Sequence, residues 1–343
     1  MVNPNMLYEL DPEGDVLLTI HNPNAPFAVW HDNAETSQPS SPQEQSDAAF
    51  PTEALPYEID LSLEPDPSPS ISEFLLSSRH LVLASDYFKR ILKGPWKEGI
   101  SAPSDGRRHV DAEDWDEDAM LILMQVIHGR NEKVPRSITL EMLGKIAVLV
   151  DYYQCHEAIM IWSDIWTNGY DVSLPATCES DKERILWILV AAVFGKETLF
   201  QIATKVALEH CSEPLPTLGL PIMNVVEEFN QRRQDLIQRV FDYLYSLLGL
   251  LRDVTVGCSF DCSSVMLGAL TIHMHEQGIL SPQLEPPYLG YSATSVMNMI
   301  RNFSTPATAG GYRTRNSMHG CTLSKLFEKD LNFEINGLSL SDI

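Results

Sequence analysis

Short apolar stretches rich in β-branched residues predict strands in the first third of the chain. Residues 14–20 follow acidic turn residues and contain Val, Leu, Thr and Ile, which is typical of a buried strand. Residues 27–30, 74–76 and 107–110 are shorter candidates of the same kind. The sequence therefore predicts a small sheet near the N-terminus.

Apolar residues at spacings of three and four mark the helices that accompany this sheet. A helix is expected at about 81–93, because Gly94 and Pro95 form a common helix stop. Another follows the acidic residues Asp114, Asp116 and Glu117, and its single apolar face contains Ala119, Ile122, Leu123, Val126 and Ile127. Thr139 is suited to cap the next helix. We therefore expect an α+β unit that ends near residue 160.

The rest of the chain has a helical pattern. Helices are expected at 181–194, 196–211, 222–252, 261–277 and 292–303, with a further short helix near 323–328. The longest carries a wide apolar stripe that must pack against other helices. The expected organisation is an α+β domain at 14–160, an all-α region at 161–303 and a largely flexible tail at 304–343.

Residues 31–70 differ in composition from their surroundings. They contain seven Pro, seven Ser, nine acidic residues and no Lys or Arg. Such a segment buries too little apolar surface to offset its ordering entropy, so it predicts a disordered acidic insertion. Within it, LPYEIDLSL at 55–63 alternates apolar and polar residues and could dock as an extra edge strand.

The distribution of charge argues against nucleic acid as a direct partner. The formal net charge is −23, and residues 1–78 hold 14 acidic residues before the first basic one, Arg79. The remaining 33 acidic and 24 basic residues form no basic stripe that could follow a phosphate backbone.

The same composition indicates a soluble protein of the cell interior. The six cysteines are scattered, as in proteins kept reduced, and the N-terminus lacks the basic start and apolar core of a signal peptide. The longest apolar run, 185–194, is far shorter than the roughly 18 residues needed to cross a bilayer. We expect a location in the nucleus or cytoplasm.

No known catalytic or metal motif stands out, so we expect no enzyme activity, no cofactor and no metal site. Cys258 and Cys262, followed by His273 and His275, could supply four zinc ligands. The two histidines, however, would point about 200° apart on a helix, so buried thiols and ordinary histidines are the simpler interpretation. Cys155 beside His156 and the isolated His80 are likewise best explained as structural residues.

One stretch resembles a known family. The sequence SSRHLVLASDYF at 77–88 is similar to the strand-to-helix signature of BTB/POZ domains. Residues 14–16, 115–128 and 143–155 resemble the neighbouring elements, and the segments 128–135 and 150–158 are most similar to the fungal branch of the family. The resemblance covers about 14–160 and implies a small sheet packed on a helix cluster, which binds protein partners.

A recurring role of that family is substrate adaptor of a cullin-based ubiquitin ligase. In such adaptors a loop after the second helix carries a bulky apolar residue, any residue and then Glu, and here Trp96 and Glu98 match that pattern. An exposed Trp is a typical interface anchor, with Glu98 at the rim. Alternatively, Trp96 packs back on its own helix end, and the protein is a scaffold or transcription-associated binding protein without a ligase.

The resemblance leaves the oligomeric state open. Animal members usually have His where this chain has Ser77, and they lack the long insertion. Many members form homodimers by exchanging an N-terminal strand and helix, whereas only about 13 residues precede the first strand predicted here. Both a homodimer and a monomer are compatible with the sequence.

Overall fold

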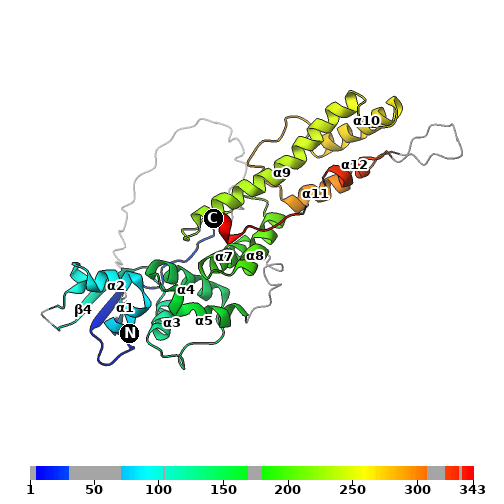
Figure 1. Ribbon diagram of the computed structural model, residues 1–343. Coiled ribbons are helices and arrows are strands. Elements are labelled where there is room, and N and C mark those ends of the chain that lie inside the picture. The colour runs from blue at the N-terminus through cyan, green and yellow to red at the C-terminus, as the bar shows by residue number, and fades with distance from the viewer. Residues whose placement is uncertain (1–4, 31–70, 103–104, 169–179, 307–320, 332–333) are drawn as a thin grey trace, which may run out of the picture. The chain divides into compact units, whose positions relative to one another are not determined.

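The computed structural model describes residues 5–30, 71–102, 105–168, 180–306, 321–331 and 334–343. The chain divides into two compact units, Met1–Lys133 and Val134–Ile343 (Figure 1). The expected insertion at 31–70, including the strand candidate at 55–63, lies outside the described residues.

The N-terminal unit contains a four-stranded mixed sheet, as the predicted α+β class requires. Its strands are β1 (Asn5–Glu9), β2 (Val16–His21), β3 (Ile71–Leu76) and β4 (Arg108–Glu113), in the order β1-β3-β2-β4. β3 pairs parallel with β1 and antiparallel with β2, which in turn pairs parallel with β4. Leu18, Phe74 and Val110 lie on adjacent strands in register and are buried in the core.

Two strand predictions require correction. β1 precedes the segment that we expected to be the first strand, and it forms an edge of the sheet, where Tyr8 stacks on Phe74 with ring centroids 4.8 Å apart. Residues 27–30 form no strand. Ala28 there has a φ of 45°, which is incompatible with extended backbone.

Four short helical segments accompany this sheet: α1 (Ser78–Ala84), α2 (Asp86–Lys93), the 3₁₀ turn η2 (Lys97–Gly99) and α3 (Glu117–Ile127). The single helix predicted at 81–93 is therefore two helices. They are separated by Ser85, which has extended backbone and whose side chain accepts a hydrogen bond from the Phe88 N–H, 3.0 Å away. One buried serine thus ends α1 and caps α2.

The C-terminal unit is mostly helical, as predicted. Its helices are α4 (Leu140–Tyr153), α5 (His156–Asn168), α7 (Asp181–Val193), α8 (Glu197–His210), α9 (Met223–Arg252), α10 (Phe260–Glu276), α11 (Ala293–Arg301) and α12 (Leu323–Asp330), with η3 (Leu340–Asp342) near the end. Thr139 caps α4 as expected, since its hydroxyl accepts from the Met142 N–H. α4 packs against α7 and α7 against α8. No helix among the described residues combines the length and apolar character needed to cross a membrane.

The apolar stripe of α9 packs as predicted against other helices. Phe241, Leu244 and Leu247 lie in a buried cluster together with Met266 of α10 and Ile300 of α11. α12 joins the same cluster through Leu323, Phe327 and the following Leu331, and it confirms the short helix expected near 323–328 within the tail. Figure 1 shows α11 and α12 following α9 and α10 along the chain.

A buried arginine holds the loops at the base of α9. Arg233 is 1% exposed and donates hydrogen bonds of 2.5–3.1 Å to the carbonyl oxygens of Cys211, Ser212, Pro287, Tyr288 and Tyr291. Burial lowers the pKa of the guanidinium, which Glu213 opposes. Five backbone acceptors thus take the place of a carboxylate partner.

Candidate protein-docking surface

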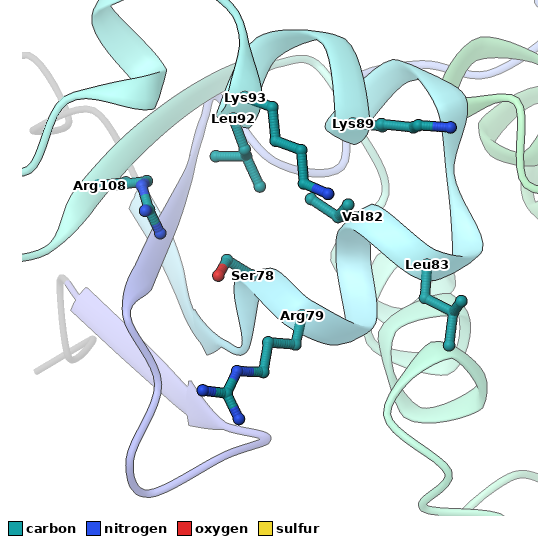
Figure 2. A pocket seen from close by; sticks show the side chains of 8 residues that line it. All are labelled: Ser78, Arg79, Val82, Leu83, Lys89, Leu92, Lys93 and Arg108. Carbon is teal, nitrogen blue, oxygen red and sulfur yellow. The ribbon is translucent and has the colours of Figure 1, made fainter.

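The N-terminal unit carries a cavity of about 550 Å³ whose rim is basic. It is lined by residues of α1, α2 and β4: Ser78, Arg79, Val82, Leu83, Lys89, Leu92, Lys93 and Arg108 (Figure 2). We call this set of residues the basic groove. In Figure 2, Lys93 extends from α2 toward Val82 on α1, while Arg108 reaches in from β4.

The break at Ser85 creates this groove. Because α1 and α2 are separate helices joined at one extended residue, their facing sides leave space between them. α2 presents Lys89 and Lys93 one turn apart, and its Leu92 is buried at the floor. Lys89 and Lys93 lie on α2, and the change of chain direction at Ser85 brings Arg79 of α1 to the same opening.

A carboxylate fixes the start of α1 at the side of the groove. Asp15, immediately before β2, accepts hydrogen bonds from the Ser78 N–H (2.8 Å) and the Ser78 hydroxyl (2.7 Å). Its second oxygen also pairs with Arg108 at 2.6 Å. Although burial raises the pKa of Asp15, the Ser78 hydrogen bonds and the Arg108 charge lower it below the usual range overall. The Asp15 side chain therefore stays ionised and forms an ion pair with Arg108. Arg108 is one of the four cations of the groove, with Arg79, Lys89 and Lys93.

The other cations of the groove are more available. Lys89 reaches Asp86 only at 3.9 Å between exposed side chains, a weak pair in water. Within the described parts of the chain, Arg79 and Lys93 engage no carboxylate at ion-pair distance. Two or three positive charges thus surround an apolar floor in a protein whose net charge is −23. Such a surface favours an acidic ligand.

Apolar surface is exposed beside the charges. Leu83 at the edge of the groove is 88% exposed. Large apolar side chains that are this accessible are typical of contact surfaces when they cluster with charges at a rim. The combination matches a polypeptide ligand with apolar and acidic residues.

Trp96 and Glu98 lie in the loop that borders the groove. The Trp96 side chain is 59% exposed, yet its indole lies against Gly94, because a Cβ at Gly94 would be 2.7 Å from the Trp96 Cδ1. Glu98 is half-buried and pairs with Lys97 at 3.9 Å. The loop joins the groove through Arg108, whose Nε donates to the Gly99 carbonyl at 3.3 Å. The structure thus places both predicted contact residues on one accessible loop.

The other residues that the sequence singled out lie elsewhere. Cys155 is 1% exposed, and burial raises the pKa of its thiol to about 12, so it is an inert core residue. His80 is exposed on α1, with its ring centroid 5.1 Å from that of His128. The His273 Nε2 accepts a hydrogen bond from the Ser304 backbone N–H, and the His273 ring stacks on Phe303.

The four groove cations were not singled out from the sequence. They are spread over 30 positions, and the only local signal is the four-residue spacing of Lys89 and Lys93. Comparison with known proteins adds no assignment. No protein-family model matches the chain, and searches of curated proteins and of solved structures found no match.

Proposed function

We propose that this chain is an intracellular, non-enzymatic protein-interaction module of the BTB/POZ kind, which docks an acidic segment of a partner protein in the basic groove. The observation that carries the proposal is the arrangement of Arg79, Lys89 and Lys93 around an apolar floor, beside the exposed Leu83. The small mixed sheet followed by α1 and α2, in the region that resembles the family signature, supports the BTB/POZ assignment.

The groove fits a peptide better than a small metabolite or a nucleic acid. Its cations are spaced along two helices around Val82 and Leu92, so acidic side chains could pair at the rim while an apolar side chain fills the floor. A nucleic-acid surface would require a longer basic track than these residues provide. An acidic partner also explains why the basic residues gather here in an acidic chain.

In a more specific version of this proposal, the partner is a cullin that contacts Trp96 and Glu98. In its favour, Trp96 presents more than half of its side chain to solvent on the loop next to the groove. The alternative is a scaffold or transcription-associated protein that binds no cullin. The ion pair between Glu98 and Lys97, together with the packing of Trp96 on Gly94, favours this alternative.

The general proposal is tested by reversing the groove charges. The full-length chain is tagged, and proteins retained by it from cell extract are quantified by mass spectrometry for the wild type and for the Arg79→Glu/Lys93→Glu variant. Lys133→Glu, an exposed basic residue of the same unit outside the groove, is the control. We expect the double variant to lose a specific set of partners at least tenfold while the control keeps them. Equal recovery by all three proteins contradicts the groove as a docking site.

The cullin contact is tested with purified components. Biolayer interferometry measures binding of the wild type, Trp96→Ala and Glu98→Ala to a purified cullin, with Val29→Ala as an exposed apolar control in the same unit. Loss of a central aromatic anchor typically costs at least about 2 kcal/mol, so Trp96→Ala should weaken binding about thirtyfold. No binding by the wild type supports the scaffold alternative.

A further inference from the structure

Three cysteines of the C-terminal unit converge on one point. The Sγ atoms of Cys258, Cys262 and Cys321 all lie within 4.8 Å of one another. Cys258 belongs to the loop between α9 and α10, Cys262 to the first turn of α10, and Cys321 precedes α12 by two residues. All three are thiols in this structure.

Separate anchors hold each cysteine in place. Ser259 caps α10 by accepting from the Cys262 N–H at 3.2 Å. The Ser263 hydroxyl donates to the Val256 carbonyl at 2.5 Å, and Gly257, with a φ of 108°, brings the loop with Cys258 against this helix start. The φ of Gly257 strains any residue with a side chain, and a Cβ there would also lie 2.7 Å from the Ser263 Oγ, so glycine is strongly favoured.

The third cysteine is anchored from the other side. Leu323 is fully buried, and its N–H donates to the Thr305 hydroxyl at 2.9 Å. Thr322 caps α12 by accepting from the Lys325 N–H. Cys321 is therefore fixed immediately before an ordered helix, although it lies 59 positions after Cys262 in the sequence.

We propose that Cys258, Cys262 and Cys321 bind one zinc ion as thiolates, with a fourth position open to water. Zinc–sulfur bonds of about 2.3 Å with tetrahedral angles place bound sulfurs about 3.8 Å apart, so side-chain rotations that close the present spacing by up to about 1 Å suffice. Three thiolates suit soft or borderline metals rather than calcium or magnesium.

The burial of the three residues fits an ion held at the surface. Cys262 is 7% exposed, Cys321 is half-buried, and Cys258 is exposed. Burial raises the pKa of the Cys262 thiol, and the neighbouring thiols raise it further. Binding of a metal ion to thiols displaces their protons. The bound ion would join the α9–α10 loop to the start of α12.

This ligand set differs from the one that the sequence offered. His273 lies three helical turns along α10 from Cys262 and uses its Nε2 atom to bind the Ser304 backbone. His275 is exposed on the same helix. Neither histidine belongs to the group of converging donors among the described residues. The third ligand is the sulfur of Cys321, which belongs to no local sequence motif, rather than a histidine nitrogen.

Cobalt titration of the full-length chain tests the site. The protein is reduced, stripped with a chelator and titrated with Co²⁺, and thiolate-to-cobalt charge-transfer absorption is followed before displacement by Zn²⁺. We expect one cobalt per chain with tetrahedral spectra that zinc abolishes. The Cys258→Ser change removes an exposed ligand without disturbing the core. It should weaken zinc binding by more than about 100-fold, because losing a ligand costs more than losing a residue that only orients a ligand.

Two control variants separate this site from alternatives. Ser264→Ala and His275→Gln change exposed residues of α10 and should retain full cobalt binding. Zinc should also raise the thermal unfolding temperature of the wild type and of both controls, but not that of Cys258→Ser. The proposal is overturned if the reduced wild type takes up no cobalt, if Cys258→Ser binds cobalt like the wild type, or if His275→Gln abolishes binding.

Discussion

Asp15 and Ser78 are 63 positions apart in the sequence, yet the carboxylate of Asp15 accepts both the backbone N–H and the hydroxyl of Ser78. The helix that starts at Ser78 has no side-chain cap from Ser77, so Asp15 satisfies a donor that the helix end would otherwise leave without an intrachain acceptor. This pair connects the beginning of β2 with the first turn of α1, one wall of the basic groove.

Replacing Asp15 with Ala should therefore destabilise the N-terminal unit. The side chain is 46% exposed, which limits the expected loss to about 1 kcal/mol. Urea denaturation followed by circular dichroism measures the change. Glu113→Ala, an exposed acidic residue of β4, is the control and should be neutral.

The contribution of Asp15 should also depend on pH in a defined direction. Its pKa is lower in the folded protein than in the unfolded chain, so the stabilisation is complete above about pH 4 and is lost as the pH falls through the folded-state pKa. The stability difference between the wild type and Asp15→Ala should shrink in that acidic range. A difference that stays constant down to acid pH would argue against the ionised pair.

His128 should make the stability of the same unit sensitive to mild acid. Its Nε2 accepts from the Ser77 N–H at 3.0 Å, so the proton sits on Nδ1, which donates to the Met124 carbonyl at 2.9 Å. Burial is the main reason that the pKa of His128 is lowered, and the nearby His80 lowers it further. The neutral ring is thus the form that the fold requires.

Because the folded-state pKa lies below the ordinary value of about 6.5, stability from His128 is complete above that pH and is lost as the pH falls below it. Denaturation midpoints measured from pH 7.5 to 5 should fall for the wild type and change less for His128→Gln. His156→Gln, at an exposed histidine of the C-terminal unit, should keep the wild-type slope. Identical slopes for all three proteins would exclude His128 as the cause.

Arg233 should be one of the most sensitive positions of the C-terminal unit. Its replacement by Met preserves much of the apolar stem but leaves five backbone carbonyls without this donor, so we expect a loss of more than about 3 kcal/mol. Arg232, the exposed neighbour, offers a matched control as Arg232→Met. Equal thermal unfolding temperatures for the two variants would contradict a stabilising role for the five Arg233 hydrogen bonds.

Salt should weaken any complex formed through the basic groove. Raising the ionic strength from about 0.1 M to about 1 M shortens the Debye length from about 10 Å to about 3 Å, which screens Arg79 and Lys93 from an acidic ligand. Partners recovered with the wild type should be released by such a wash. Partners that resist the wash yet disappear with the double charge reversal would indicate an apolar rather than an electrostatic contact.

Several elements were predictable because local signals agreed with the tertiary structure. The strand at 14–20, the Thr139 cap and the five C-terminal helices expected between 181 and 303 appear with bounds close to those expected. β1 was missed because it is a short edge strand whose Met6 and Leu7 are more than half exposed, so it lacks the pattern of a buried strand. At 27–30 the apolar composition indicated a strand, but the positive φ of Ala28 prevents it.

The candidate sites were less predictable because each depends on contacts between distant segments. Trp96 and Glu98 form a short contiguous pattern, so the sequence could point to them. Arg79 and Arg108 meet only because α1 follows β3 while β4 pairs with β2. Cys321 joins Cys258 and Cys262 only through the packing of α12, a relationship that no spacing rule encodes.

Ser85 illustrates how a position can control recognition without touching a ligand. It is 2% exposed, and its single hydroxyl sets the direction in which α2 leaves α1. If the groove docks a partner as proposed, a mutational screen that scored only partner capture would therefore identify Ser85 together with Lys93, because Ser85 shapes the opening that Lys93 lines. Measuring the stability of each variant as well as its affinity distinguishes the two roles, because replacing Ser85 changes the fold of the α1–α2 junction whereas replacing Lys93 changes only the groove surface.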